Sequence, residues 1–101
     1  MSINVLNKQD GDPVISLGER FDFGSVDQFR SSYESLNGIK RKSLIVDFKN
    51  TRYMDSSALG MLINARSYFK DCDVKIKIIN ANDQIKKIFS ISRFDTKFEI
   101  T

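Results

Sequence analysis

A short apolar run followed by a helical pattern limits the folds open to this chain. Residues 44–48 are rich in β-branched and apolar side chains and are bounded by polar ones, which predicts a buried strand. Beyond them, apolar residues recur at steps of three and four, so they share one face of a helix that continues to about Lys70: Ala58, Leu62, Ala65 and Phe69. The residues between strand and helix, Asp55-Ser56-Ser57, therefore fall where a helix presents unpaired backbone N–H groups.

Other patterns place further elements on both sides of this pair. Strands are predicted at residues 3–7, 14–17, 74–78 and 96–100, with a turn at 9–13. Ser25 is expected to cap a helix that Gly38 ends, and Asp83 a later helix. Gly18 to Gly24 is expected to be a loop. From residue 43 onward strands and helices alternate, which predicts an α/β fold with parallel pairing and right-handed crossovers. We expect one domain, residues 1–101, in which one sheet face is covered better than the other.

The composition favours a soluble domain and gives little support for nucleic-acid or membrane partners. A chain of 101 residues has room for one core, and 41% hydrophobic and 29% charged residues are ordinary values. The net charge is only +3, and its densest basic cluster is Lys40-Arg41-Lys42. No apolar run is long enough to span a bilayer, and the N-terminus lacks a signal-peptide pattern. The single cysteine, Cys72, suits a reducing compartment, so a cytoplasmic location is expected.

Several residue patterns that common catalytic sites need are missing from the sequence. The chain has no histidine, which excludes Ser-His and Cys-His nucleophile pairs. A Ser-Lys pair remains formally possible, but no motif places a lysine near Ser56. Acidic residues show no metal-ligand spacing, and neither a phosphate-binding loop nor a dinucleotide motif occurs. We therefore expect no enzymatic activity, no metal and no cofactor, and we expect that this domain is acted upon by other proteins.

The central stretch Tyr53-Met54-Asp55-Ser56-Ser57-Ala58-Leu59-Gly60 resembles the signature of the STAS domain, the family named for sulphate transporters and anti-sigma factor antagonists. Residues 18–22 resemble the turn that closes its second strand, and residues 82–89 resemble its penultimate helix. The resemblance runs nearly end to end and implies a mixed sheet of four to five strands with three to four helices. Two positions depart from the family pattern: Ala58 replaces a usual Gly, and residues 91–94 replace a usual Gly-Leu turn.

The resemblance also implies a phosphorylation site and its partners. In such antagonists the serine directly after the Asp, here Ser56, is phosphorylated by an anti-sigma factor or serine kinase of histidine-kinase-like ATPase fold. A metal-dependent phosphatase reverses the reaction, and the unmodified form sequesters the kinase partner. Asp55 then orients the site, Asp22 is a nearby docking residue, and Ser57 is the weaker phosphoacceptor candidate. Single-domain relatives serve sporulation, stress and biofilm pathways.

Physical chemistry allows such a switch without refolding. A helix N-terminus favours negative charge by about 0.3–1 kcal/mol, so the fold tolerates phosphoserine there. The same charge buried at an interface without a cationic partner costs several kcal/mol, so binding is lost. The simpler alternative is that Asp55 or Ser56 only caps the helix.

The apolar residues around the motif have two interpretations. Met54, Met61 and Tyr68 either fill the edge of the core or form the apolar part of a docking surface. Phe21 and Phe23, beside Asp22, either anchor a loop or contact the partner. A different function also remains open, namely a constitutive scaffold subunit of a transporter or lipid-trafficking complex, in which the serines only cap the helix.

Overall fold

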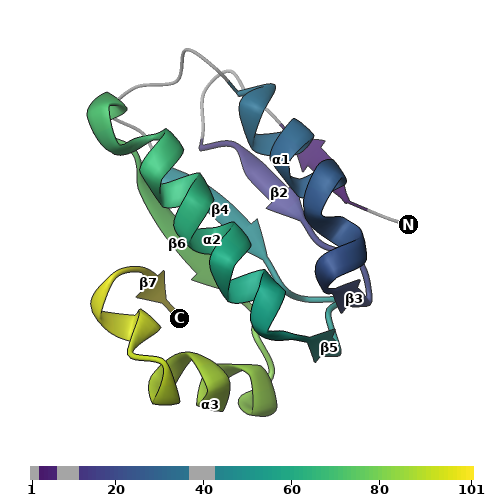
Figure 1. The fold of residues 1–101 in the computed structure, drawn as a ribbon. Coiled ribbons are helices and arrows are strands. Elements are labelled where there is room, and N and C mark those ends of the chain that lie inside the picture. Colours follow the sequence, from purple (N-terminus) through teal and green to yellow (C-terminus); the bar gives the residue numbers. More distant parts are fainter. Residues whose placement is uncertain (1–2, 7–11, 37–42) are drawn as a thin grey trace.

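A five-stranded mixed sheet forms the centre of the molecule (Figure 1). The computed structural model describes residues 3–6, 12–36 and 43–101. β1 pairs antiparallel with β2, and the remaining neighbouring pairs in the sheet are all parallel. In spatial order the strands are β1 (Asn4–Leu6), β2 (Val14–Ser16), β4 (Ser43–Asp47), β6 (Lys75–Ile79) and β7 (Glu99–Ile100).

Three helices connect the parallel strands: α1 (Val26–Glu34), α2 (Ser56–Tyr68) and α3 (Asp83–Ile91). Figure 1 shows α1 and α2 side by side across one face of the sheet. Along β4, Leu44 and Val46 are fully buried, whereas the alternate residues Ile45 and Asp47 remain partly exposed. The predicted α/β class is confirmed. The described residues form a mixed sheet of five strands and three α-helices, within the expected four to five strands and three to four helices.

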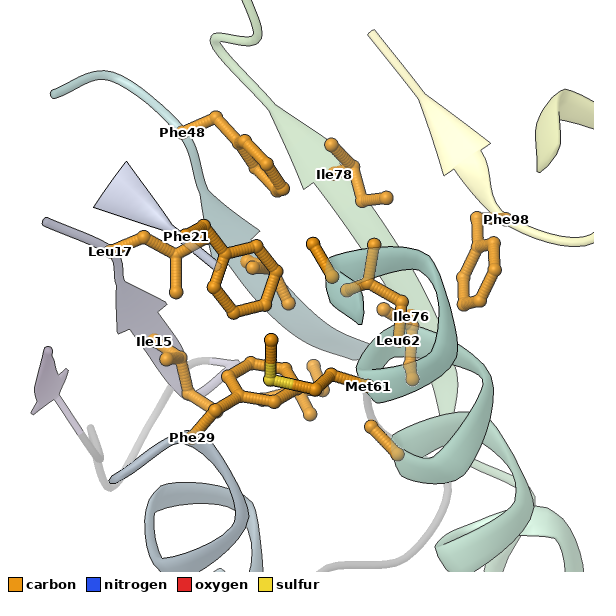
Figure 2. Close-up of a cluster of buried hydrophobic side chains, with 14 of the residues drawn as sticks. Ile15, Leu17, Phe21, Phe29, Phe48, Met61, Leu62, Ile76, Ile78 and Phe98 are labelled. Carbon is orange, nitrogen blue, oxygen red and sulfur yellow. The ribbon is translucent and has the colours of Figure 1, made fainter. Parts of the chain in front are cut away.

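A chain of aromatic rings runs through the core beneath the helices. Phe21 lies 5.0 Å from Phe29 and 5.8 Å from Phe48 between ring centroids, and Phe48 lies 5.6 Å from Phe89. All three contacts are edge-to-face, and each such pair is worth roughly 0.5–1.5 kcal/mol beyond its buried area. Figure 2 shows Phe21 and Phe29 meeting the side chain of Met61, which comes from α2. This cluster fixes the start of α2 against the segment that precedes α1.

The structure corrects two expectations about the segments that flank the helices. The region from Gly18 to Gly24 is not only a loop, because it holds β3 (Arg20–Phe21) and the start of a 3-10 turn, η1 (Phe23–Ser25). The last strand is limited to Glu99–Ile100, because residues 94–96 form another 3-10 turn, η3 (Phe94–Thr96). A third such turn, η2 (Lys70–Cys72), follows α2.

Asn82 rather than Asp83 caps α3. The Asn82 side chain accepts a hydrogen bond from the Ile85 N–H at 2.8 Å, and Asp83 is the first helical residue. Several predicted features lie outside the described residues: part of the turn at 9–13, the helix stop at Gly38, and the basic cluster 40–42.

Candidate functional site

The start of α2 presents one serine to solvent and uses the preceding aspartate as its cap. Asp55 has an extended backbone, and its Oδ1 accepts a hydrogen bond from the Ala58 N–H at 3.2 Å. Ser56 is the first residue of α2 and is exposed, whereas Ser57 is half-buried. Because Asp55 performs the capping, the fold does not need the Ser56 hydroxyl for that purpose.

The second carboxylate oxygen of Asp55 links α2 to a distant part of the chain. Its Oδ2 accepts a hydrogen bond from the Phe23 N–H at 3.3 Å. Phe23 opens the 3-10 turn η1, which leads into α1. One side chain therefore holds the beginnings of both helices together.

A short parallel sheet of two strands strengthens this junction. β3 pairs with β5 (Tyr53–Met54), with Arg20 opposite Tyr53 and Phe21 opposite Met54. The Glu19 carbonyl accepts hydrogen bonds from the N–H groups of Arg52 and Tyr53, at 2.8 and 3.2 Å. The segment before α1 and the segment before α2 therefore run side by side up to Asp22 and Asp55.

Asp22 shapes the 3-10 turn η1 and also holds a cation. Its Oδ1 accepts a hydrogen bond from the Gly24 N–H at 3.0 Å, and its Oδ2 pairs with Arg20 Nε at 3.2 Å. The Ser25 hydroxyl accepts from the Asp22 N–H at 3.3 Å and donates to the Arg20 carbonyl at 3.2 Å. Ser25 thus precedes α1 as expected but makes no capping hydrogen bond to it, because its hydroxyl points back to the turn.

Three of the five apolar candidates lie in the core. Phe21 is 0% exposed, Met54 7% and Met61 6%, and Figure 2 shows Phe21 and Met61 within the hydrophobic cluster. The interpretation of these three side chains as a docking surface does not hold in this structure, because little or none of their area reaches solvent. Phe23 is different. It is 75% exposed, because β3 ends at Phe21 and η1 turns the next aromatic ring outward.

One further aromatic residue at the site escaped the sequence analysis. Tyr53 is 44% exposed, and the Arg20 guanidinium lies over its ring at 4.3 Å from the centroid. The sequence signal that could have indicated this exposure was the alternation of side chains along a strand, since Tyr53 and Met54 occupy opposite faces of one short strand. Exposed Phe23 and Tyr53 thus belong to the two paired segments that lead to Ser56.

Comparison with known proteins agrees with this architecture. A model of the STAS domain matches residues 5–101. The chain belongs to the STAS domain family. A STAS-domain containing protein of Pseudomonas aeruginosa (strain UCBPP-PA14) is 37% identical over 102 residues, which cover 100% of both chains.

Solved structures share the fold of this STAS domain at low sequence identity. The anti-sigma factor antagonist SpoIIAA in its unphosphorylated form has a TM-score of 0.76 and 16% identity, over 99% of this chain and 87% of that chain. The phosphorylated form of the Bacillus cell fate determinant SpoIIAA has a TM-score of 0.74 and 17% identity, over 99% and 91%.

The two departures from the STAS pattern have clear structural consequences. Ala58 is 0% exposed in the first turn of α2, and its N–H receives the Asp55 cap, so a small side chain is accommodated there. After α3, Arg93 adopts a positive φ of 59°, a conformation that glycine adopts at lower cost. Phe94 is then buried, while Ile91 remains 74% exposed.

Tyr68 lies at the far end of α2 from Ser56. They are twelve positions apart, which is about 18 Å along a helix. The Tyr68 ring is 40% exposed and lies 5.3 Å from the ring of Tyr33, whose pKa is raised by burial. Tyr68 therefore belongs to the junction of α1 and α2, away from the serine.

The described part of this STAS domain has neither a metal-ion cluster nor a membrane-spanning helix. Residues 3–6, 12–36 and 43–101 contain no group of three or more His, Cys, Asp or Glu side chains arranged to hold a metal ion. Within the same ranges, no helix has the length and apolar character needed to cross a membrane.

Proposed function

We propose that this domain is a partner-switching regulator of the anti-sigma factor antagonist type, controlled by phosphorylation of Ser56. In its unmodified form it binds an anti-sigma factor or serine kinase of histidine-kinase-like ATPase fold in the cytoplasm. Phosphorylation by that kinase ends binding, and a metal-dependent phosphatase restores it. The controlled output is a transcription programme of the sporulation, stress or biofilm kind.

The observation that carries this proposal is that Asp55 makes the capping hydrogen bond, while Ser56 is exposed and is not needed for capping. Both carboxylate oxygens of Asp55 accept backbone hydrogen bonds, from Ala58 and from Phe23. Ser56 is exposed at the first helical position, where a kinase can reach its hydroxyl. A modification of Ser56 therefore leaves the cap and the junction in place.

The surroundings of Ser56 supply a surface for a partner. Phe23 and Tyr53 are exposed by 75% and 44%, and both belong to the segments joined by Asp55 and by the β3–β5 pair. Exposed aromatic side chains are typical of the centre of protein interfaces. Asp22 and Asp55 add negative charge, and Arg20, the cation beside them, is already paired with Asp22 at 3.2 Å. A phosphate at Ser56 would therefore join a surface whose nearby cation is already neutralised.

The mechanism that follows is electrostatic exclusion. In water, repulsion between phosphoserine and its acidic neighbours is screened, so the free domain keeps its fold. In a complex, the phosphate would be buried beside carboxylates and aromatic rings, which costs several kcal/mol. Each 1.4 kcal/mol reduces affinity tenfold, so a cost of this size is enough to release the partner. The fold similarity to SpoIIAA in both its unphosphorylated and phosphorylated forms supports a switch that needs no refolding.

The test is a phosphorylation assay with matched serine variants. Wild type, Ser56→Ala and Ser57→Ala are incubated with the candidate kinase and Mg-ATP, and intact masses are measured. Wild type and Ser57→Ala should gain one phosphate, and Ser56→Ala should gain none. Phosphate incorporated into Ser56→Ala as efficiently as into wild type would refute the assignment.

A further inference from the structure

A basic hollow lies at the end of α2 opposite Ser56. Its volume is about 450 Å³, and the lining residues come from the last turn of α2, from η2, from the start of β6 and from the segment before β7: Arg66, Ser67, Lys70, Val74, Lys75 and Lys97. Four of these six side chains are cationic. Residues 56 and 68 mark the two ends of α2, so the hollow is about 18 Å from the serine.

None of the four cations belongs to an ion pair among the described residues. In the parts of the chain that the structure describes, the ion pairs are Arg20–Asp22, Arg30–Asp27 and Lys77–Glu99. None of these involves a lining residue of the hollow. The positive charge of the hollow is therefore left to solvent or to a ligand.

Helix electrostatics explains only half of this charge. Arg66 and Lys70 lie at the C-terminal end of α2, where cations offset the helix dipole. Lys75 and Lys97 have no such role. Lys77 pairs with Glu99 across β6 and β7, and two residues before that pair on each segment lie Lys75 and Lys97. Lys97 lies in the turn before β7 rather than opposite Lys75 in a strand pair, but both side chains line the same hollow. Their like charges repel each other, so an anion in the hollow would relieve that repulsion.

We propose that this hollow binds a short acidic segment of a protein partner. Carboxylates suit the lysines and the arginine, the Ser67 hydroxyl can donate a hydrogen bond, and Val74 offers apolar contact to the segment's backbone. The basic surface is short, because acidic residues lie close in the sequence to the residues that line it. Asp71 follows Lys70, Asp73 precedes Val74, and Glu99 lies two positions after Lys97. This favours a few carboxylates over a long phosphate backbone.

The exposed apolar residues argue against a membrane as the occupant. Among the described residues, the large hydrophobic side chains that reach solvent are Leu6, Phe23, Tyr53, Ile63, Tyr68 and Ile91. None of them lines the hollow, whereas membrane-surface binding combines cations with apolar anchors.

The hollow acts independently of the serine switch. Charges about 18 Å apart are separated by roughly two Debye lengths at physiological salt, where this length is about 8 Å. Phosphorylation of Ser56 should therefore leave the affinity for an acidic segment unchanged within about twofold. The basic hollow can keep a partner bound while the surface at Ser56 switches. The proposal for the hollow does not depend on whether Ser56 is phosphorylated.

The test uses a fluorescein-labelled hexaglutamate peptide and fluorescence anisotropy at low and physiological salt. Lys75→Glu/Lys97→Glu reverses two charges in the hollow. Lys49→Glu/Lys86→Glu makes the same change in net charge at a different hollow, lined by Lys49, Asn80, Ala81, Lys86 and Thr101. The first pair should weaken binding roughly tenfold or more, and the control pair by less than about threefold. Ser56→Asp should bind as wild type does.

Three results would overturn the proposal. The first is that wild type does not bind hexaglutamate at low salt, and the second is that both double variants lose the same amount of affinity for the peptide. The third is that wild type binds oligo-dT or phosphatidylserine vesicles more tightly than hexaglutamate and that Lys75→Glu/Lys97→Glu abolishes this binding. If charge reversal lowers the thermal midpoint of unfolding, Lys75→Gln/Lys97→Gln neutralises the same pair and is tested against Lys49→Gln/Lys86→Gln.

Discussion

The starts of α2 and α3 are built alike but face different surroundings. Asp55 caps α2 and Asn82 caps α3, each from an extended backbone and each through the N–H three residues later. The next residue is Ser56 in α2 and Asp83 in α3, and both are exposed. The first helical position thus carries a neutral hydroxyl in one helix and a permanent negative charge in the other.

This comparison bears on how the fold and the docking surface would each respond to a phosphate at Ser56. Asp83 demonstrates that the fold accommodates a negative charge at the first position of a capped helix, where the helix dipole favours it. The difference lies outside the helices. Aromatic Phe23 and Tyr53 accompany the start of α2, whereas Lys49 and Lys86 line a hollow beside the start of α3. We therefore expect an added negative charge at Ser56 to leave the fold intact and, under the proposed switch, to prevent docking at the start of α2.

The largest expected effect is on partner binding. Ser56→Asp should weaken binding of the domain to its kinase partner by roughly a hundredfold or more, because it buries a charge at a surface whose nearby cation, Arg20, is already paired with Asp22. Asp83→Ser, which removes the corresponding charge from α3, should leave binding within about twofold. Isothermal titration calorimetry with the purified kinase measures both. Equal affinities for wild type and Ser56→Asp would show that the two helix starts do not differ in function.

The next largest effect is on stability, from the cap of α2. Asp55→Ala should lower the free energy of unfolding by about 2 kcal/mol, since it removes both the cap and the acceptor for the Phe23 N–H. Asp55→Asn keeps one oxygen and should recover about half of the loss. Urea unfolding followed by circular dichroism gives these values.

The cap of α3 should contribute less. Asn82→Ala should cost about 1 kcal/mol, because Asn82 accepts one short hydrogen bond from the Ile85 N–H and its bond to the Thr51 carbonyl is long, at 3.5 Å. The same urea experiment applies. A cost for Asn82→Ala above that for Asp55→Ala would refute the view that Asp55 joins two helices.

The smallest effects concern the charge at the first helical position. Ser56→Asp should change the free energy of unfolding by less than about 0.5 kcal/mol and with a stabilising sign at low salt, while Asp83→Ser should destabilise by a similar amount. Unfolding at two salt concentrations separates these signs. A loss above about 1 kcal/mol in Ser56→Asp would mean that phosphorylation disturbs the fold itself.

The sequence predicted the large elements well because their periodicities are long enough to detect. α2 repeats its apolar stripe over several turns, and residues 74–78 alternate strictly, so both were identified close to their observed bounds. Periodicity does not show which of two adjacent residues caps a helix. In Asn82-Asp83 both side chains are good caps, and only the backbone geometry decides that Asn82 is the one used.

The junction at the site was harder to predict. β3 and β5 contain two residues each, too few for any pattern, and their pairing joins segments more than thirty positions apart. Without that pairing, Phe21 and Phe23 look equivalent. The end of β3 between them is what buries one ring completely and leaves the other 75% exposed.

The pairing of β3 with β5 also bears on how such proteins diverge. Its main-chain hydrogen bonds do not depend on which side chains occupy positions 23 and 53, so duplicated genes can vary these two residues while the frame persists. Under the proposed function, a cell with several such domains could then direct each one to a different partner by changing these two aromatic side chains, while the strand pairing that positions them is kept.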